Sequence, residues 1–203
     1  MLKKIKALLI QWIMGLKIYN YLLLKIIPYI RFTTYYTSFE GWKYHLGYKV
    51  LKKGDIILTR DNKKLTTLLI GGEFTHAALC VSKDKNFEVA EMTHKNFTKS
   101  CFFDICKESD RVVILRCYDW DEDYITKVIE ECKSHENAHY DSKFSLGVKL
   151  LYCSELIYMS DIEKRLKVSL EDLAGIGQPY ISPTGLYKAE NIKVIWDSAK
   201  TIN

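Results

Sequence analysis

Short motifs that would assign this chain to several large protein classes are missing from it. Its 203 residues contain no phosphate-binding loop, no dinucleotide-binding fingerprint and no internal repeat. The six cysteines match no zinc-ligand spacing, and no basic stripe interleaved with aromatic residues follows Tyr48. These absences disfavour nucleotide-dependent enzymes, repeat proteins, zinc-binding domains and nucleic-acid-binding proteins. We expect the protein to use neither a metal nor another cofactor.

Acidic residues are absent from the N-terminal part of the chain. The first 39 residues carry six Lys or Arg and no Asp or Glu, whereas the whole chain has a net charge of only +5. The remainder is therefore close to neutral. A long uncharged apolar run is absent as well, because Lys17, Asn20 and Lys25 interrupt this segment. That absence argues against a transmembrane helix, which needs about 20 predominantly apolar residues.

The same segment nevertheless has the periodicity of an amphipathic helix. Its apolar residues recur at steps of three and four from Leu2 to Leu16, and the pattern continues to a break near Pro28. Three roles stay open for residues 1–30. They are a helix docked on its own domain or on a protein partner, a helix lying in a membrane surface, and a signal peptide or uncleaved anchor. The basic start fits a signal peptide, but no small-x-small cleavage site follows it.

Three predicted strands supply the first part of a candidate site. The sequence predicts strands at 54–59, 74–81 and 87–92, and the short link at 83–86 makes the last two a hairpin. His76 lies near the start of the second strand, and Glu91 lies on the third. A histidine beside a carboxylate can act as a base whose tautomer the carboxylate fixes.

A cysteine at the start of a predicted helix supplies the second part. Cys153 is followed at three and four residues by Leu156 and Ile157, which places these two on one helical face. The helix dipole and the free backbone N–H groups at a helix N-terminus favour a thiolate over a thiol. The sequence therefore predicts Cys153 as the nucleophile, His76 as the base and Glu91 as the group that orients the base.

Two rivals for the orienting group follow from the sequence. Glu88 falls on the opposite face of the same strand from Glu91, so only one of the two can point at the histidine. His94, just past the strand, is a weaker candidate.

The order and spacing of four short motifs resemble a known family. The motifs are Gly-Asp-Ile-Ile at 54–57, Thr-His-Ala-Ala at 75–78, Val-Ala-Glu-Met at 89–92 and Tyr-Cys-Ser-Glu-Leu at 152–156. They resemble the YiiX/YebB-like group of circularly permuted papain-like hydrolases, which is related to NlpC-type cell-wall peptidases and to lecithin retinol acyltransferase. The resemblance runs from about residue 52 to about residue 196. The histidine precedes the cysteine here, as the permuted order requires.

The resemblance implies a role for each matching residue. His76 matches the family's base, Cys153 its nucleophile and Glu91 its third polar group, although Met92 departs from the usual alanine. Tyr152 before the nucleophile and Thr75 before the base are candidates for the oxyanion site or for substrate contact. The backbone N–H of Cys153 is the more general oxyanion donor.

Aromatic residues upstream of the cysteine leave two readings open. Tyr140 is a further candidate for substrate contact, and with Phe144 it would line the approach to Cys153. Both would otherwise be core aromatics.

The expected fold is an α+β, circularly permuted papain-like (NlpC-type) fold. A small antiparallel sheet or barrel would pack on the helix that bears Cys153, with an N-terminal amphipathic helix added. Apolar residues make up 48% of the chain, which is enough for a core. We divide the chain into an N-terminal helical segment at 1–48 and a catalytic domain at 49–203. Scaffold elements are predicted at Arg111–Cys117 (strand), Glu122–Ser134 (helix) and 192–196 (strand).

The predicted function is hydrolysis of an amide or ester bond through a thioester intermediate. Peptidoglycan peptide or amide bonds are the first choice of substrate. A lipid acyl bond at a membrane, cleaved or transferred, is the alternative, and a noncatalytic structural component of a larger assembly is the second alternative. No nucleic-acid partner is expected.

The remaining cysteines bear on the compartment. Cys80, Cys117 and Cys132 lie in apolar-periodic segments, which is typical of core packing, and no disulfide framework is expected in a chain with this much core. The pattern favours a reducing, cytoplasmic or membrane-associated location. Secretion to the cell envelope is the alternative.

Overall fold

The structure is a computed structural model that describes residue 8 and residues 12–30, 39–62, 72–83, 89–147 and 149–200. Most of the predicted helix at 2–16 lies outside the described residues, and so do Gly71, Phe87 and Glu88. Of that helix, residues 12–15 are helical, and the backbone turns extended at Leu16 before the next helix begins. The N-terminal segment is therefore interrupted at Leu16, which the periodicity did not predict.

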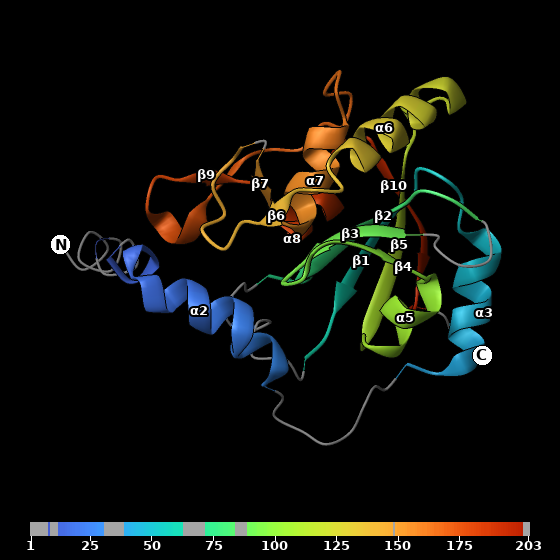
Figure 1. The fold of residues 1–203 in the computed structure, drawn as a ribbon. Coiled ribbons are helices and arrows are strands. Elements are labelled where there is room, and N and C mark those ends of the chain that lie inside the picture. The colour runs from blue at the N-terminus through green and yellow to red at the C-terminus, as the bar shows by residue number, and fades with distance from the viewer. Residues whose placement is uncertain are drawn as a thin grey trace.

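A six-stranded antiparallel sheet forms the centre of the molecule (Figure 1). Its strands are β1 (Ile56–Arg60), β2 (His76–Cys80), β3 (Val89–Thr93), β4 (Asn96–Ser100), β5 (Arg111–Cys117) and β10 (Ile192–Asp197). They are ordered β10-β5-β1-β2-β3-β4, and every neighbouring pair is antiparallel. The predicted hairpin of the second and third strands is thereby confirmed.

Helices surround this sheet, and two short ladders complete the fold. The helices are α2 (Lys17–Lys25), α3 (Gly41–Val50), α5 (Phe102–Lys107), α6 (Glu122–Ser134), α7 (Cys153–Ser160) and α8 (Pro183–Tyr187), with 3-10 turns η1 (Ile27–Tyr29) and η2 (Leu173–Gly175). The ladders are β6 (His139–Tyr140) with β7 (Leu150–Leu151), which are parallel, and β8 (Glu171–Asp172) with β9 (Pro179–Tyr180), which are antiparallel. None of the described helices combines the length and the apolar character needed to cross a bilayer.

The sheet is buried on both faces because apolar residues occupy successive positions in its central strands. Along β1, Ile56 and Leu58 belong to one core cluster, whereas Ile57 belongs to the other. All three side chains are fully buried. Strands with one solvated face would alternate apolar and polar residues, so this pattern requires a layer of helices on each side.

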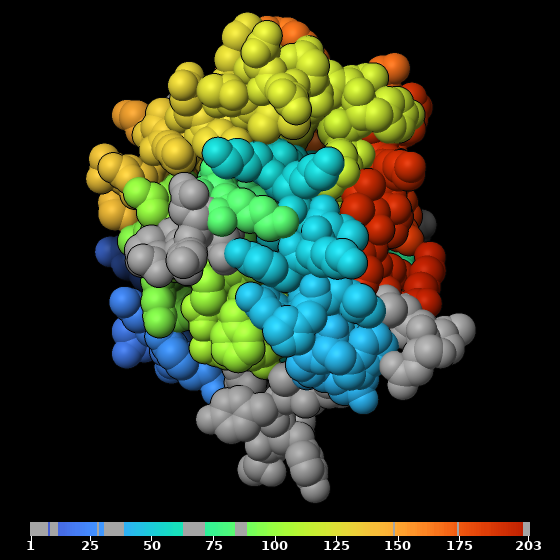
Figure 2. All heavy atoms as spheres, turned by 90° about the vertical axis from the view of Figure 1, so that its right-hand side faces the viewer, coloured from blue at the N-terminus to red at the C-terminus, as the bar shows by residue number. Residues whose placement is uncertain are grey.

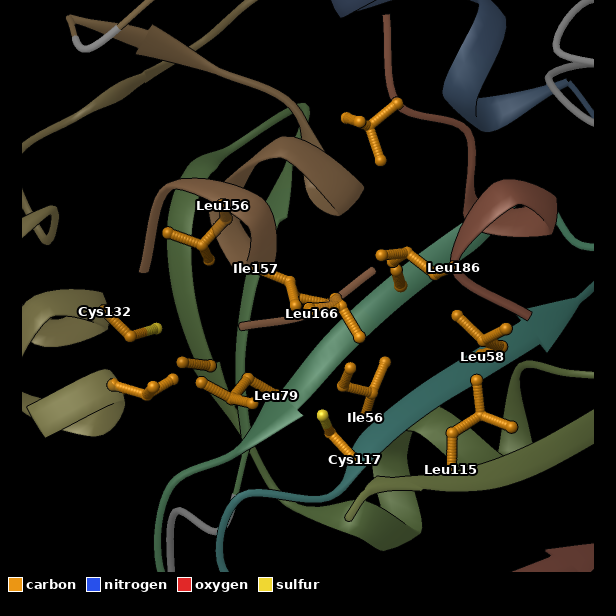
Figure 3. Packing of buried hydrophobic residues seen from close by; sticks show 14 of the residues in the cluster. Ile56, Leu58, Leu79, Leu115, Cys117, Cys132, Leu156, Ile157, Leu166 and Leu186 are labelled. Carbon is orange, nitrogen blue, oxygen red and sulfur yellow. The ribbon is translucent and has the colours of Figure 1, made fainter. Parts of the chain in front are cut away.

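The first core cluster lies between the sheet and the helices α6, α7 and α8. Figure 3 shows Leu156 and Ile157 of α7 and Leu186 of α8 packed toward side chains of β1, β2 and β5. Leu156 and Ile157 are fully buried, as their spacing from Cys153 predicted. Truncating such a fully buried Leu costs about 2–5 kcal/mol. The packing therefore fixes α7, and with it Cys153, relative to β2.

The second core cluster lies on the opposite face of the sheet, under α3 and α5. Figure 2 shows this side of the molecule, with α3 between α5 and the C-terminal strand β10. Gly47 of α3 lies so close to Trp196 of β10 that an added Cβ would come within 2.9 Å of the indole ring. The expected boundary between 1–48 and 49–203 falls inside α3, and this helix packs on the sheet.

Two scaffold predictions match the structure in their bounds. β5 and α6 cover the predicted ranges, and α6 buries Tyr124, Val128, Ile129 and Cys132 on one face. Asp121 caps α6 by accepting a hydrogen bond from the Tyr124 N–H at 2.8 Å. β4, α3 and α5 were not predicted, because their sequences show little periodicity.

Candidate active site

His76 and Glu91 lie side by side on neighbouring strands. Glu91 pairs across the ladder with Ala78, two residues from the histidine, which puts both side chains on one face of the sheet. His76 Nε2 lies 2.6 Å from Glu91 Oε2, and the Ser100 hydroxyl donates a hydrogen bond to the other carboxylate oxygen. The Glu91 side chain is 10% exposed and that of His76 is 27% exposed. The carboxylate is thus held from one side and presented to the imidazole from the other.

Cys153 is the first residue of α7 and reaches the same histidine. Its thiol hydrogen-bonds with His76, and as a thiolate it accepts hydrogen bonds from the backbone N–H groups of Ala77 and Ser154. The β2–β3 ladder ends at the pair Ala78–Glu91, although both strands continue beyond it. Beyond this pair, the N-terminus of α7 lies against β2, where the Ala77 N–H faces the Cys153 sulfur. Because Nε2 faces Glu91, Nδ1 is the ring nitrogen that remains for the sulfur.

The electrostatics of this arrangement favour a charged pair. Burial lowers the pKa of His76, but the hydrogen bonds with Cys153 and then with Glu91 outweigh it and raise the pKa to about 10. Burial raises the pKa of the Cys153 thiol, but His76 and the backbone donors outweigh it and bring the pKa below its ordinary value. Each partner stabilises the charged form of the other, so these contacts favour a thiolate beside an imidazolium.

Tyr140 is brought next to the nucleophile by the short ladder of β6 and β7. It pairs with Leu151, two residues before Cys153, and its backbone N–H donates to the Asn96 side chain at 3.1 Å. Burial, and then the nearby Cys153 and Asp141, raise the pKa of the Tyr140 hydroxyl well above its ordinary value. Tyr140 is therefore a neutral phenol beside the thiolate.

Tyr152 and Thr75, the other two residues predicted to contact substrate, form hydrogen bonds with other parts of the chain. The Tyr152 hydroxyl accepts a hydrogen bond from the backbone N–H of Ile181 at 2.8 Å, and its ring packs edge-on against Phe144. Thr75 is buried, and its backbone N–H donates to the Thr59 carbonyl at 3.0 Å. Their roles at an oxyanion site stay predictions.

Of the two rivals for the orienting group, the structure describes only His94. Glu88 lies outside the described residues. His94 lies in the turn between β3 and β4, where its Nε2 lies 3.1 Å from the Tyr29 hydroxyl. Within the described part of the chain, Glu91 is the carboxylate that meets His76.

Glu155 supports the site in a way that the sequence reading missed. It is fully buried at the third position of α7 and accepts hydrogen bonds from the backbone N–H groups of Gly147 at 2.7 Å and Tyr152 at 3.3 Å. Burial raises its pKa to about 8, against the lowering effect of those donors. A carboxylate three residues after a helix N-cap is one half of a capping box, and this signal could have identified it. Glu155 ties the loop at 141–147 to the start of α7.

Thr184 is a second supporting residue that sequence reasoning did not find. Its hydroxyl accepts hydrogen bonds from the backbone N–H groups of Glu73 and Phe74, both at 3.0 Å, and donates to the Phe74 carbonyl at 3.3 Å. Gly72 has a φ of +79°, and a Cβ there would lie 2.6 Å from the same hydroxyl. The chain that enters β2 just before His76 is therefore fixed by a residue more than 100 positions later.

A pocket in the described part of the chain does not include the catalytic candidates. It has a volume of about 190 Å³ and is lined by Met14, Gly15, Lys143, Ser145, Ile176 and Gln178. No group of three or more His, Cys, Asp or Glu side chains in the described part of the chain is placed to hold a metal ion.

A cysteine at a helix start, a histidine on a strand and a carboxylate behind it define a papain-like cysteine hydrolase, with the histidine first in the chain as in the permuted members. Comparison with protein families agrees. Residues 50–184 match the permuted papain-like amidase enzymes of the YaeF/YiiX, C92 family, and this chain belongs to that family. It is therefore an enzyme of the amidase or peptidase type.

A solved structure supports the fold. The crystal structure of the metalloprotein yiiX from Escherichia coli O157:H7 superposes with a TM-score of 0.55 at 14% sequence identity, covering 72% of this chain and 97% of that one. That relative is described as a metalloprotein, but no cluster of three or more His, Cys, Asp or Glu side chains in the described part of this chain fits a metal. A search of curated proteins found no match to this chain.

Proposed function

We propose that Cys153, His76 and Glu91 hydrolyse an amide bond through a thioester formed on Cys153. The observation that carries this proposal is the continuous hydrogen-bonded path from the Cys153 thiol through the His76 ring to Glu91. A nucleophile, a base and a group that orients the base are the three parts that acyl transfer needs.

The chemical steps follow from this geometry. The Cys153 thiolate attacks the carbonyl carbon, and the His76 imidazolium gives its Nδ1 proton to the leaving amine as the C–N bond breaks. The now neutral imidazole then takes a proton from a water molecule, whose oxygen attacks the thioester. Breaking of the C–S bond releases the acid and restores the thiolate–imidazolium pair. Glu91 stabilises the imidazolium at Nε2 throughout.

Peptide or amide bonds of peptidoglycan are the substrate we propose first. The family consists of amidases, and a papain-like thiolate attacks an amide without a metal. A lipid acyl bond is the second candidate. It is favoured by the position of α2, which carries exposed apolar side chains and contacts the site at Ser142.

Two experiments in sequence test this proposal: acylation tests the nucleophile, and parallel turnover assays test the substrate class. A reactive acyl probe should label Cys153 of the wild-type protein, as mapped by mass spectrometry, and His76→Ala should label far more slowly. Muropeptides and N-acyl or ester phospholipids are then assayed side by side for new amine or fatty acid. Labelling spread over the other cysteines, with no turnover of either substrate class, would instead favour a noncatalytic role.

A further inference from the structure

Helix α2 has apolar residues around its whole circumference, and only one side of it is covered. The partly buried positions are Tyr19, Asn20, Leu23 and Leu24, which recur at helical spacing. The positions between them are exposed. We define the outer face of α2 as Ile18, Tyr21, Leu22 and Ile26 together with Lys17 and Lys25.

The covered side of α2 rests on the segment that leads to the nucleophile. Asn20 Oδ1 accepts a hydrogen bond from the Ser142 hydroxyl at 2.6 Å. Burial, and then the neighbouring Asp141, raise the pKa of the Tyr19 hydroxyl, and Tyr19 in turn lies near Tyr140. Figure 1 shows α2 beside β6 and β7, on the opposite side of the molecule from α3. The helix is thus anchored next to the active site.

The outer face is too apolar for a surface that meets only water. Ile18 is 59% exposed, Tyr21 61%, Leu22 37% and Ile26 40%, and Trp12 in the preceding turn is 64% exposed. A row of large apolar side chains on one helix face marks an interaction surface, unlike single exposed residues.

The charge of this region identifies the kind of partner. Lys17 and Lys25 flank the apolar row, and the first 39 residues carry six basic residues and no acid, while the rest of the chain is close to neutral. Apolar side chains between lysines match a bilayer with anionic headgroups, because the apolar groups enter the headgroup–acyl boundary while the ammonium groups meet the phosphates.

We infer that the outer face of α2 binds an anionic membrane surface, and that this contact places the Cys153 site at the bilayer. Two of the three roles considered for residues 1–30 are then combined in α2: one side docks on the catalytic domain and the other meets the lipid. This inference does not depend on the bond that the enzyme cleaves.

Vesicle flotation with the full-length protein tests the inference. We expect binding to phosphatidylcholine vesicles that contain phosphatidylglycerol at low salt, at least about tenfold weaker binding in 0.5 M salt, and no binding to phosphatidylcholine alone. Failure to float with either vesicle at low salt, or equal binding to both, overturns it.

Matched variants locate the contact on α2. The double variant Ile18→Glu/Leu22→Glu should lose binding, while Ile162→Glu, at a 48% exposed apolar residue just after α7, should bind like the wild type. Lys17→Glu/Lys25→Glu tests the charge without changing the apolar row and should also lose binding. Equal binding of all these variants overturns the inference, and thermal unfolding checks that each variant is folded.

One further variant separates this inference from the proposed function. Cys153→Ala should bind vesicles as the wild type does while losing all hydrolysis. Binding that fails in a protein that still hydrolyses a small soluble amide overturns the membrane contact alone.

Discussion

Glu91 Oε2 lies 2.6 Å from His76 Nε2, so one carboxylate oxygen faces the imidazole while Ser100 holds the other. A carboxylate in this position fixes the tautomer that leaves Nδ1 toward Cys153, and it stabilises the ring when the ring is charged. The contact joins two strands that are consecutive in the sheet. It therefore exists only if their register pairs Glu91 with Ala78.

Glu91→Gln tests this relationship directly. We expect turnover to fall by roughly 10²-fold, since an amide cannot stabilise the imidazolium as a carboxylate does. The fold should persist, because Gln keeps the shape of the side chain. Glu88→Gln, which removes the rival carboxylate that the sequence offered, should change turnover little, because strand alternation predicts opposite faces for positions 88 and 91. The reverse ranking, measured as kcat/KM on the same amide substrate, would contradict the assignment.

The three catalytic candidates could be predicted because each carries a local signal. His76 opens a β-rich run, Cys153 starts an apolar-periodic helix, and Glu91 falls on the strand after a short link. Each signal lies within a few residues of its own position. The permuted fold was implied by the resemblance of four motifs to the YiiX/YebB-like group, which the order of histidine and cysteine fits.

Thr184, unlike Glu155 at its capping-box position, carries no local signal that predicts its role. Thr184 holds Phe74 through contacts 110 residues apart, and no periodicity at either position records that pairing. Long-range contacts of this kind become visible only in three dimensions.

Cys153 should be the fastest of the six cysteines to react with iodoacetamide near neutral pH. Its pKa is lowered by His76, whereas burial raises the pKa of Cys117 to about 11 and that of Cys132 to about 12. Cys101 is the informative control, because it is more accessible than the 4% exposed Cys153. Peptide mapping after limited alkylation gives the order, and its pH dependence should report an apparent pKa below the ordinary ~8.5. Preferential labelling of Cys101 at pH 7 would contradict a thiolate at Cys153.

Thr184→Val should weaken both the fold and the site. It keeps the size of the side chain but removes the hydroxyl, which leaves the buried N–H of Phe74 without its acceptor. We expect the free energy of unfolding to fall by about 1–3 kcal/mol, measured by denaturant titration. Turnover should fall as well, because the chain entering β2 positions His76. Thr184→Ser, which retains the hydroxyl, should keep most of the stability and most of the turnover. Equal stability and equal turnover of the Val and Ser variants would show that this hydroxyl does not support the site.

The pKa of His76 should depend on both of its partners, and more on Cys153 than on Glu91. The pKa of this imidazole is raised to about 10 from an ordinary value near 6.5, with Cys153 contributing more than Glu91 against the lowering effect of burial. The imidazolium should therefore persist at pH 8 in the wild type, and the active ion pair should be lost only as the pH rises through about 10 or falls through the lowered pKa of the thiol. An NMR titration of the ring C–H resonance, assigned by its absence in His76→Asn, measures this. In Cys153→Ala the midpoint should move down by more than it does in Glu91→Gln, because the larger stabilising partner is gone while the burial remains. A wild-type midpoint between pH 6 and 7 would show that the thiolate–imidazolium pair does not form at rest.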